Sequence, residues 1–165
     1  MIVWLIGKSG VGKTFLAKKL YQRIKKKYKK VIWIDGDEFR KKYSKDLRYS
    51  IRDRKKNSKR IHEFCKKYEK KEFLVLCSIL SIFKEHQKLN RKVFTNYFQI
   101  YIKSNTKILK IRNKKNIYSI KKNVVGKDII FPNPYKSDLI IKNNFNKKFT
   151  KNLKIIEKSI YARIS

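Results

Sequence analysis

The stretch IVWLIGKSGVGKT occupies residues 2–14. Residues 2–6 are all apolar and are followed by glycine, a pattern typical of a strand buried on both faces. Residues 7–14 then place four residues between a first glycine and Gly-Lys-Thr, which is the full phosphate-loop pattern. Residues 13–28 repeat apolar side chains at helical spacing. This order of strand, loop and helix predicts an α/β fold whose first loop binds a nucleoside triphosphate.

The loop has the groups that binding of a triphosphate requires. Its glycines let successive backbone N–H groups turn toward the phosphates, and the amino terminus of the following helix adds its positive end. Lys13 can reach the β- and γ-phosphates of ATP as a point charge, and the Thr14 hydroxyl can bind Mg²⁺. The predicted nucleotide-binding residues of the loop are Gly7, Lys8, Ser9, Gly10, Val11, Gly12, Lys13 and Thr14.

Strand-like and helix-like segments alternate along the rest of the chain. Further strands are predicted at residues 31–34, 73–76, 97–102 and 138–141, and further helices at 51–70, 84–93, 105–112 and 150–163, with a short helix or turn up to about residue 43. Such alternation favours right-handed crossovers and a mostly parallel central sheet with helices on both faces. We predict one P-loop kinase domain over residues 1–165. Ligands of such sheets lie at the carboxyl ends of the strands.

The formal net charge of +34 is the most unusual property of the composition. It suggests nucleic-acid binding, but the lysines are spread along the whole chain and the residue choice is that of AT-rich codons. We therefore expect nonspecific attraction of polyanions at low salt and no specific nucleic-acid partner. A noncatalytic module that binds ATP and polyanions is an alternative that remains open.

The apolar and cysteine patterns indicate the surroundings of the protein. No apolar run approaches the roughly 20 residues that a membrane-spanning helix needs, and the start of the chain lacks the features of a signal peptide. Cys65 and Cys77 are isolated and have no metal-type spacing. We expect a cytoplasmic protein without a membrane partner.

A pair of aspartates follows the second predicted strand, in the sequence Asp35-Gly36-Asp37-x-x-Arg40. Carboxylates at this place can organise Mg²⁺ or accept a proton from an attacking hydroxyl, and Arg40 could bind the phosphate of the acceptor. The alternative is a turn with a helix cap, since Asp and Gly favour both. Guanine-reading motifs of GTPases are absent, which favours a small-molecule kinase.

The order of these motifs resembles the adenylylsulfate kinases, which transfer the γ-phosphate of ATP to the 3′-hydroxyl of adenylyl sulfate. The match runs from about Ile2 to Asn143. Beyond the loop and the aspartate pair, it includes Asp46-Leu47-x-Tyr49-Ser50, Asp53-Arg54-x-x-Asn57-x-x-Arg60-Ile61, Ser81, Arg112-x-x-Lys115-x-Ile117-Tyr118, Asn123-x-x-Gly126 and Pro132-x-Pro134. The resemblance also implies a short lid at about residues 113–126 and a possible homodimer.

Several roles in phosphoryl transfer follow from the resemblance. It implies that Asp37 is the base or orienter for the acceptor hydroxyl and that Asp35 supports Mg²⁺. Lys13 would neutralise phosphoryl charge, and Arg112 would pack against ATP from the lid. Ser81 matches a serine that is treated as a phosphoserine position in the family, although direct in-line transfer needs no such intermediate.

The resemblance also implies how the acceptor is bound. Arg40, Arg54 and Asn57 would hold its phosphate and ribose, Tyr49 would stack on its base, and Lys115 would lie over it. The alternative is that Arg54, Asn57 and Lys115 are ordinary solvated residues.

Two departures from the family pattern fall on the acceptor pocket. Asn123-Val124-Val125-Gly126 stands where the family has Asn-Phe-Thr-Gly, which removes an aromatic that would stack on a base. Ile79-Leu80-Ser81-Ile82-Phe83 replaces Phe-Ile-Ser-Pro-Tyr, and the lid is several residues shorter. A similar pattern occurs in relatives associated with capsule biosynthesis. We therefore expect a Mg²⁺/ATP-dependent kinase of a nucleotide 3′-hydroxyl, with adenylyl sulfate or a cytidine nucleotide such as cytidine diphosphoramidate as acceptor.

Overall fold

The computed structural model describes residues 1–112, 123–145 and 149–164. Within them, five parallel strands form one sheet in the order β2-β3-β1-β4-β5. The strands are β1 (Ile2–Ile6), β2 (Val31–Asp35), β3 (Leu74–Ile79), β4 (Tyr97–Lys103) and β5 (Leu139–Lys142). The predicted α/β class with a parallel sheet is confirmed, and β1 lies at the centre of the sheet.

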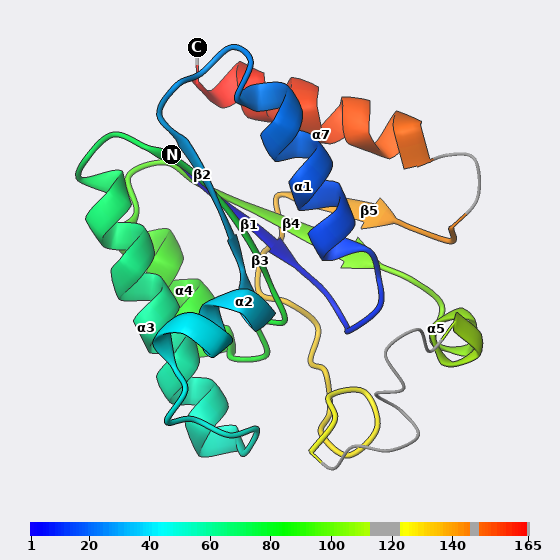
Figure 1. The fold of residues 1–165 in the computed structure, drawn as a ribbon. Helices are drawn as coiled ribbons and strands as arrows, with labels where there is room; N and C mark the ends of the chain where they lie inside the picture. The colour runs from blue at the N-terminus through cyan, green and yellow to red at the C-terminus, as the bar shows by residue number, and fades with distance from the viewer. Residues whose placement is uncertain (113–122, 146–148, 165) are drawn as a thin grey trace.

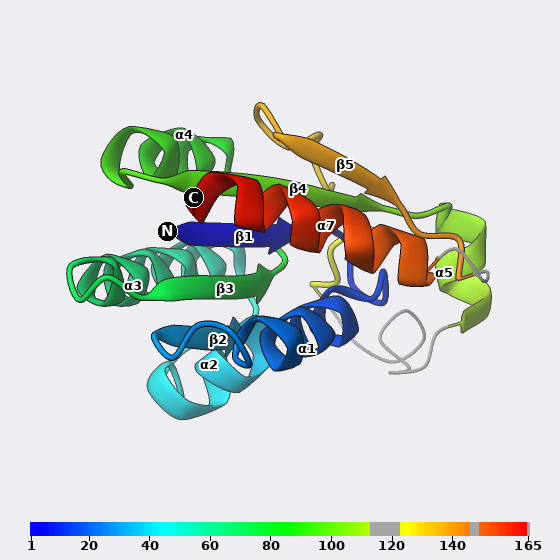
Figure 2. The ribbon, with the colours of Figure 1, turned by 90° about the horizontal axis from the view of Figure 1, so that it is seen from above.

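Helices cover both faces of the sheet, as Figures 1 and 2 show. The helices are α1 (Lys13–Ile24), α2 (Gly36–Tyr43), α3 (Ile51–Glu69), α4 (Lys84–Val93), α5 (Thr106–Arg112) and α7 (Phe149–Ile164). Helices α1 and α7 pack on one face, whereas α2 and α3 pack on the other. No helix in the described part of the chain is long and apolar enough to cross a membrane.

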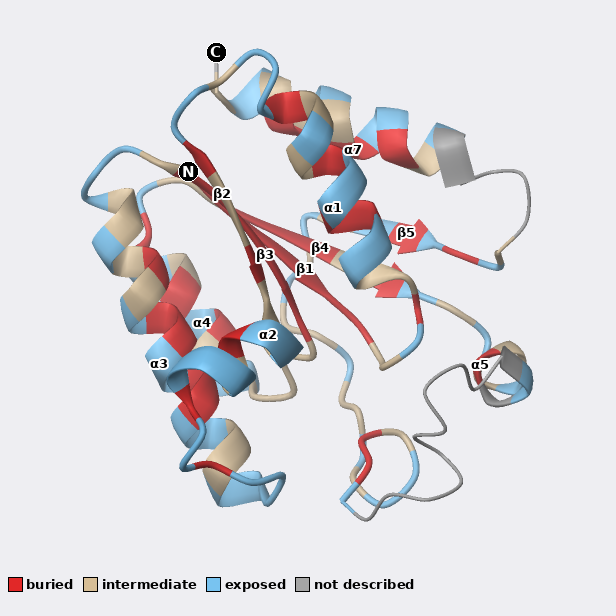
Figure 3. Cartoon of the chain, viewed as in Figure 1, coloured by how far each residue is buried: buried red, intermediate tan, exposed pale blue. Residues whose placement is uncertain are grey.

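The buried central strand divides its side chains between two apolar cores. Val3 and Leu5 join the core beneath α1 and α7, and Ile2, Trp4 and Ile6 join the core beneath α2 and α3. This division follows from the two-residue period of a strand. It explains why residues 2–6 are continuously apolar, and Figure 3 shows the burial of the whole sheet centre.

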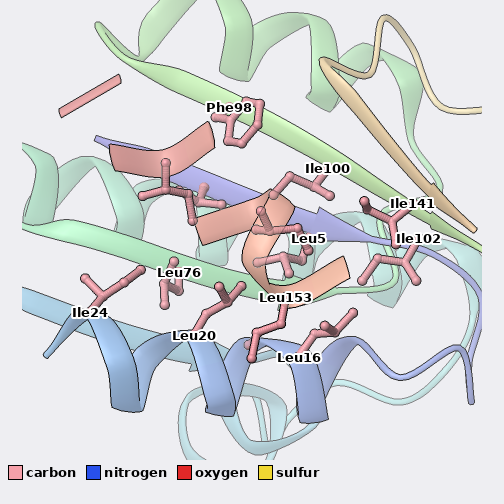
Figure 4. Packing of buried hydrophobic residues seen from close by; sticks show 14 of the residues in the cluster. Leu5, Leu16, Leu20, Ile24, Leu76, Phe98, Ile100, Ile102, Ile141 and Leu153 are labelled. Carbon is pink, nitrogen blue, oxygen red and sulfur yellow. The ribbon is translucent and has the colours of Figure 1, made fainter. Parts of the chain in front are cut away.

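The first core fixes α1 to the sheet. Leu16, Leu20 and Ile24 project from α1 at intervals of one helical turn into the core that also contains Leu5 of β1 and Leu153 of α7 (Figure 4). All five side chains are at most 3% exposed. Burying a side chain of this size contributes about 1.5–3 kcal/mol. The packing therefore holds the amino terminus of α1 beside the carboxyl end of β1.

Candidate active site

Two glycines shape the loop between β1 and α1 because no larger residue fits. At Gly7, a Cβ atom would lie 2.4 Å from the Ile102 carbonyl oxygen, so the loop approaches β4 backbone to backbone. Gly12 precedes α1 with φ of 96°, and a Cβ atom there would lie 2.9 Å from Asn143 Nδ2. Since Gly12 has no side chain to cap the helix, the first N–H groups of α1 are available to a phosphate.

The two lysines of the loop have different partners. Lys13 Nζ donates to the Lys8 carbonyl oxygen at 2.8 Å, which holds the ammonium group against the loop backbone. Lys8 Nζ instead donates to Thr106 Oγ1 at 3.1 Å and thereby links the loop to α5. Lys13 therefore has its ammonium group at the loop, and its phosphate-binding role stays a prediction.

Asn143 fixes the loop from the far end of the chain. Its side chain is 3% exposed, its Nδ2 donates to the Val11 carbonyl oxygen at 2.9 Å, and its Oδ1 accepts from Phe145 N at 3.2 Å. A buried carbonyl group without this partner would cost about 1–3 kcal/mol. Sequence analysis did not identify this role. Asparagine after a short apolar strand is an ordinary strand ending, and only the pairing of β5 with β4 brings it beneath the loop.

Asp35 has the capping role that the sequence offered as one alternative, and its role with Mg²⁺ stays a prediction. Its Oδ1 accepts from the N–H groups of Asp37 and Glu38, at 3.0 and 3.4 Å, and so caps α2. Its Oδ2 accepts from Thr14 Oγ1 at 2.6 Å and from Ser78 Oγ at 3.2 Å. Ser78 was missed by sequence analysis, since its position depends on the register that pairs it with Asp35. One carboxylate thus starts a helix and lies against the phosphate loop.

Asp37 lies in the first turn of α2, where its side chain is exposed. The helix cap orients this turn, so Asp37 follows Asp35 onto the carboxyl edge of the sheet. Its charge is close enough to raise the pKa of both Arg40 and Arg54, although burial lowers each of these pKa values more strongly. Asp37 therefore belongs to the same cluster as the two arginines.

Arg40 and Arg54 both lie against Tyr49. Their guanidinium carbons are 5.0 and 5.4 Å from the centroid of the Tyr49 ring, which is within the range of cation–π attraction. Backbone carbonyl groups orient them: Arg40 donates to Arg48 O at 2.7 Å, and Arg54 donates to Tyr49 O and Asn123 O at 3.0 and 2.9 Å. Three residues predicted from three separate motifs are thus brought together.

The electrostatics of this cluster favour an anion. Burial lowers the pKa of Arg40 and of Arg54, and the positive charge of Arg40 lowers that of Arg54 further. Both groups stay charged, because an arginine guanidinium is not deprotonated in proteins. Each guanidinium carries five N–H donors, and the carbonyl contacts use only part of them. A phosphate placed between them would relieve the repulsion and accept the remaining hydrogen bonds.

Asn57 lies one turn further along α3 and is 7% exposed. Its Oδ1 has no hydrogen-bond partner among the described residues. A buried amide oxygen without a partner is costly, which is consistent with a ligand or water as its partner. The alternative of a solvated helix residue is therefore wrong for Asn57.

Ser81 follows β3 in the left-handed backbone region, with φ of 44°. Its Oγ accepts from Trp4 Nε1 at 3.4 Å and from Gln87 Nε2 at 3.2 Å, and its carbonyl oxygen also accepts from Gln87 Nε2 at 3.1 Å. A non-glycine residue rarely adopts this conformation, so surrounding contacts must hold it. Gln87 supplies two of them and was not identified from the sequence.

Residues 124–129, which include the Val-Val pair that departs from the family pattern, fold into a closed turn. The Val124 carbonyl oxygen accepts from the N–H groups of Asp128 and Ile129, at 2.8 and 3.1 Å, and Val124 N donates to Asp128 Oδ2 at 2.8 Å. Val124 and Val125 are 4% and 2% exposed. Neither side chain therefore presents a surface on which a base could stack.

The structure describes the predicted lid only at its ends. Arg112 is the last residue of α5, and Lys115 lies outside the described residues, as do residues 113–122 of the predicted lid. The bond from Arg54 to Asn123 O shows where the chain returns, next to the arginine cluster.

A parallel α/β sheet with a phosphate loop, and with carboxylates and arginines at the same edge, defines a nucleotide-dependent phosphotransferase. The family model for adenylylsulphate kinase matches residues 1–142. The chain belongs to the adenylylsulphate kinase family and is a kinase.

Three relatives illustrate the relationship. Cytidine diphosphoramidate kinase of Campylobacter jejuni is 35% identical over 167 residues, which cover 96% of this chain and 95% of that protein. Adenylyl-sulfate kinase of Bacillus velezensis is 30% identical over 147 residues, covering 85% and 75%. An adenylylsulphate kinase of Mycobacterium tuberculosis, solved with AMPPNP and APS, is 23% identical with a TM-score of 0.81, covering 99% of this chain and 96% of that one.

Proposed function

We propose that this kinase transfers the γ-phosphate of ATP, with Mg²⁺, to the ribose 3′-hydroxyl of a cytidine diphosphate derivative. The observation that carries the proposal is the position of the first turn of α2. Asp35, which caps this turn, accepts a hydrogen bond from Thr14 of the phosphate loop, and Asp37 on the turn lies within the electrostatic reach of Arg40 and Arg54. The turn therefore separates a triphosphate site from a second anion site.

The residues beside the phosphate loop fit Mg²⁺. This ion prefers oxygen ligands, usually one or two from the protein together with phosphate oxygens and water. Thr14 Oγ1 and Asp35 Oδ2 are two such oxygens, 2.6 Å apart. Thr14 would bind the ion directly and Asp35 would bind it or its water. When bound, the ion neutralises charge on the β- and γ-phosphate oxygens.

Each remaining residue of the site then has one task. Lys13 and the N–H groups at the start of α1 bind the phosphates of ATP. Arg40 and Arg54 hold the phosphate of the acceptor with the donors that the backbone carbonyls leave over. Asp37 orients the acceptor hydroxyl and takes its proton. Catalysis is therefore mainly positioning and charge stabilisation.

The choice of a cytidine nucleotide rests on two observations. The relative that carries this activity in its name matches almost the full length of both chains at 35% identity. In addition, Val124 is buried within its turn, so Tyr49 is the aromatic of the predicted pair that remains at the site. Stacking of a base on an aromatic side chain contributes about 1–3 kcal/mol. A pyrimidine has less ring area than a purine, so it loses less binding free energy when one stacking partner is absent.

Adenylyl sulfate is the second candidate acceptor. The family model favours it, and the phosphate loop, Asp35 and Asp37 would serve it equally well. Its base would stack on Tyr49 but would lack the second aromatic, which Val124 replaces. We expect measurable but weaker turnover with adenylyl sulfate.

Steady-state turnover with a panel of acceptors tests the proposal. ATP consumption is measured at saturating ATP with cytidine diphosphoramidate, cytidine 5′-diphosphate and adenylyl sulfate, and the phosphorylated position is assigned by NMR. We expect the highest kcat/KM with the cytidine compounds and a 3′-phosphate in the product. Asp37→Asn should remove turnover, whereas Glu38→Gln, an exposed neighbour on the same helix, should not. Turnover with adenylyl sulfate but with neither cytidine compound would refute the cytidine assignment. A lack of turnover with all three acceptors would refute the proposed activity on a nucleotide 3′-hydroxyl.

A further inference from the structure

Helix α4 has an unusual distribution of polar and apolar side chains. Gln87 and Asn90 face inward and are each 1% exposed, whereas Leu89 and Val93 are 44% and 36% exposed. Polar side chains are buried when specific hydrogen bonds hold them. Asn90 Oδ1 lies 2.6 Å from His62 Nδ1, and Gln87 lies between Ser81 and Tyr135. Gln87 is therefore buried because Ser81 and Tyr135 satisfy its amide group.

The backbone of Tyr135 determines which way the Gln87 amide points. Tyr135 N lies 2.6 Å from Gln87 Oε1, and a backbone N–H can only donate. The amide oxygen must therefore face Tyr135, and the amide nitrogen must face Ser81. This removes the ambiguity between the two ends of an amide side chain. Gln87 Nε2 donates to Ser81 O at 3.1 Å and to Ser81 Oγ at 3.2 Å.

The second partner of the Ser81 hydroxyl is also a donor. The indole Nε1 of Trp4 has a proton and no lone pair for a hydrogen bond, and it lies 3.4 Å from Ser81 Oγ. Neither Trp4 nor Gln87 Nε2 can therefore accept the Ser81 proton. That proton must point away from both, and Ser81 itself is only partly exposed at the carboxyl edge of β3.

We propose that Gln87 is a positioning residue that makes the Ser81 hydroxyl a hydrogen-bond donor to an oxygen of the acceptor nucleotide. The inference deepens the proposed function and rests on it. Both lone pairs of Ser81 Oγ face donors, so the hydroxyl has no lone pair ready to attack a phosphorus atom. Ser81 thus binds the acceptor and does not carry a phosphoryl group during turnover. This assigns the predicted phosphoserine position a purely noncovalent role.

The substitution Gln87→Glu tests the orientation with little change of shape. A glutamate oxygen can still accept from Tyr135 N, but a carboxylate offers Ser81 an acceptor in place of a donor. The Ser81 proton would then turn toward residue 87 and away from the ligand. Ser81→Ala removes the same proton, and Gln22→Glu, on the exposed face of α1, is the matched control for the added charge.

We expect Gln87→Glu and Ser81→Ala each to raise the acceptor KM about ten- to hundredfold and to leave the KM for ATP unchanged. The double variant should be no worse than either single one, because both remove one interaction. In Gln87→Glu the loss should grow from about pH 6 to about pH 9 as the buried carboxyl ionises, since its protonated form can still donate. An additive double variant, or a Gln87→Glu variant with wild-type acceptor KM, would overturn the proposal.

A second measurement does not depend on the acceptor. The wild-type protein is incubated with γ-labelled ATP, alone and with cytidine 5′-diphosphate, and Ser81 is inspected by peptide mass spectrometry. We expect no phosphoryl group on Ser81, and its transient appearance at the rate of turnover would overturn the inference. If no acceptor supports turnover, the proposed function fails, and a phosphoryl group that ATP alone places on Ser81 would still overturn the inference. This measurement also decides the matter if Gln87→Glu lacks a cooperative melting transition.

Discussion

Thr14 Oγ1 donates to Asp35 Oδ2 across 2.6 Å, so the first turn of α1 and the last residue of β2 are joined directly. The strand that precedes this helix, β1, and the strand that ends at Asp35, β2, are not neighbours in the sheet, because β3 lies between them. Ser78 on β3 also donates to Asp35 Oδ2, at 3.2 Å. The carboxylate is thus held from both sides before any ligand binds, which is the preorganisation that charge stabilisation requires.

Asp35→Asn separates the two roles of this residue. Asparagine caps a helix about as well as aspartate, so Tm should stay close to that of the wild type. The lost charge should lower kcat on the order of 100-fold and weaken the dependence of the rate on Mg²⁺ concentration. Asp35→Ala, the control, should lose the cap as well and about 1 kcal/mol of stability. Wild-type turnover by Asp35→Asn would show that the carboxylate serves only as a cap.

Asn143→Ala should loosen the phosphate loop although it removes no group that contacts a phosphate. The Val11 carbonyl group would lose its partner in a buried place, which should cost about 1–3 kcal/mol of stability. The KM for ATP should rise and the acceptor KM should change little. Urea denaturation and steady-state kinetics measure both effects. Asn144→Ala alters the exposed neighbour and serves as the control; equal behaviour of the two variants would contradict the role of Asn143.

Arg54→Lys should weaken acceptor binding although it keeps the charge. Lysine has no planar fork, so it cannot donate to Tyr49 O and Asn123 O while also holding a phosphate. The acceptor kcat/KM should fall about ten- to hundredfold, with the KM for ATP unchanged. Arg52→Lys lies on the exposed side of the same helix and should have no effect. A larger change in the KM for ATP than in the acceptor kcat/KM would contradict this role, because it would show that Arg54 binds ATP and not the acceptor.

His86 should make the stability depend on pH. Burial lowers its pKa below the usual 6.5, while Glu85 raises it and Lys55, His62 and Lys59 lower it further. The unfolded chain therefore binds more protons, so stability is complete above pH 6.5 and is lost as pH falls through the folded pKa. Tm of the wild type should fall between about pH 7 and pH 5, and it should fall less in His86→Gln. Lys88→Gln, exposed on the same helix, should follow the wild type.

The sequence predicted the elements of the fold well because hydrophobic periodicity records local burial. Residues 2–6 and the helix at 84–93 were located correctly in this way. Helix α1 ends at Ile24, four residues before the predicted end, since Lys25 and Lys26 donate to Tyr21 O and Arg23 O in a closing turn. Apolar spacing does not distinguish such a turn from another helical turn.

The site was predictable where a motif carried it and was not predictable where distant segments meet. Arg40, Tyr49 and Arg54 come together as the resemblance implied. Asn143 and Gln87 were missed because their roles arise from sheet order and from the direction of an amide group, which no spacing encodes. The burial of Val124 was also not predicted. The sequence indicated that an aromatic is missing at this position, but not that the side chain in its place is buried.

The contact of Asn143 with Val11 has a consequence for biosynthesis. The phosphate loop leaves the ribosome before the side chain that satisfies its backbone, which is 132 positions later in the chain. A nascent or truncated chain that ends before this asparagine has the complete loop sequence and lacks the contact that fixes it. We therefore expect such a chain to bind ATP more weakly than a chain that includes Asn143, because its loop lacks this buried hydrogen bond.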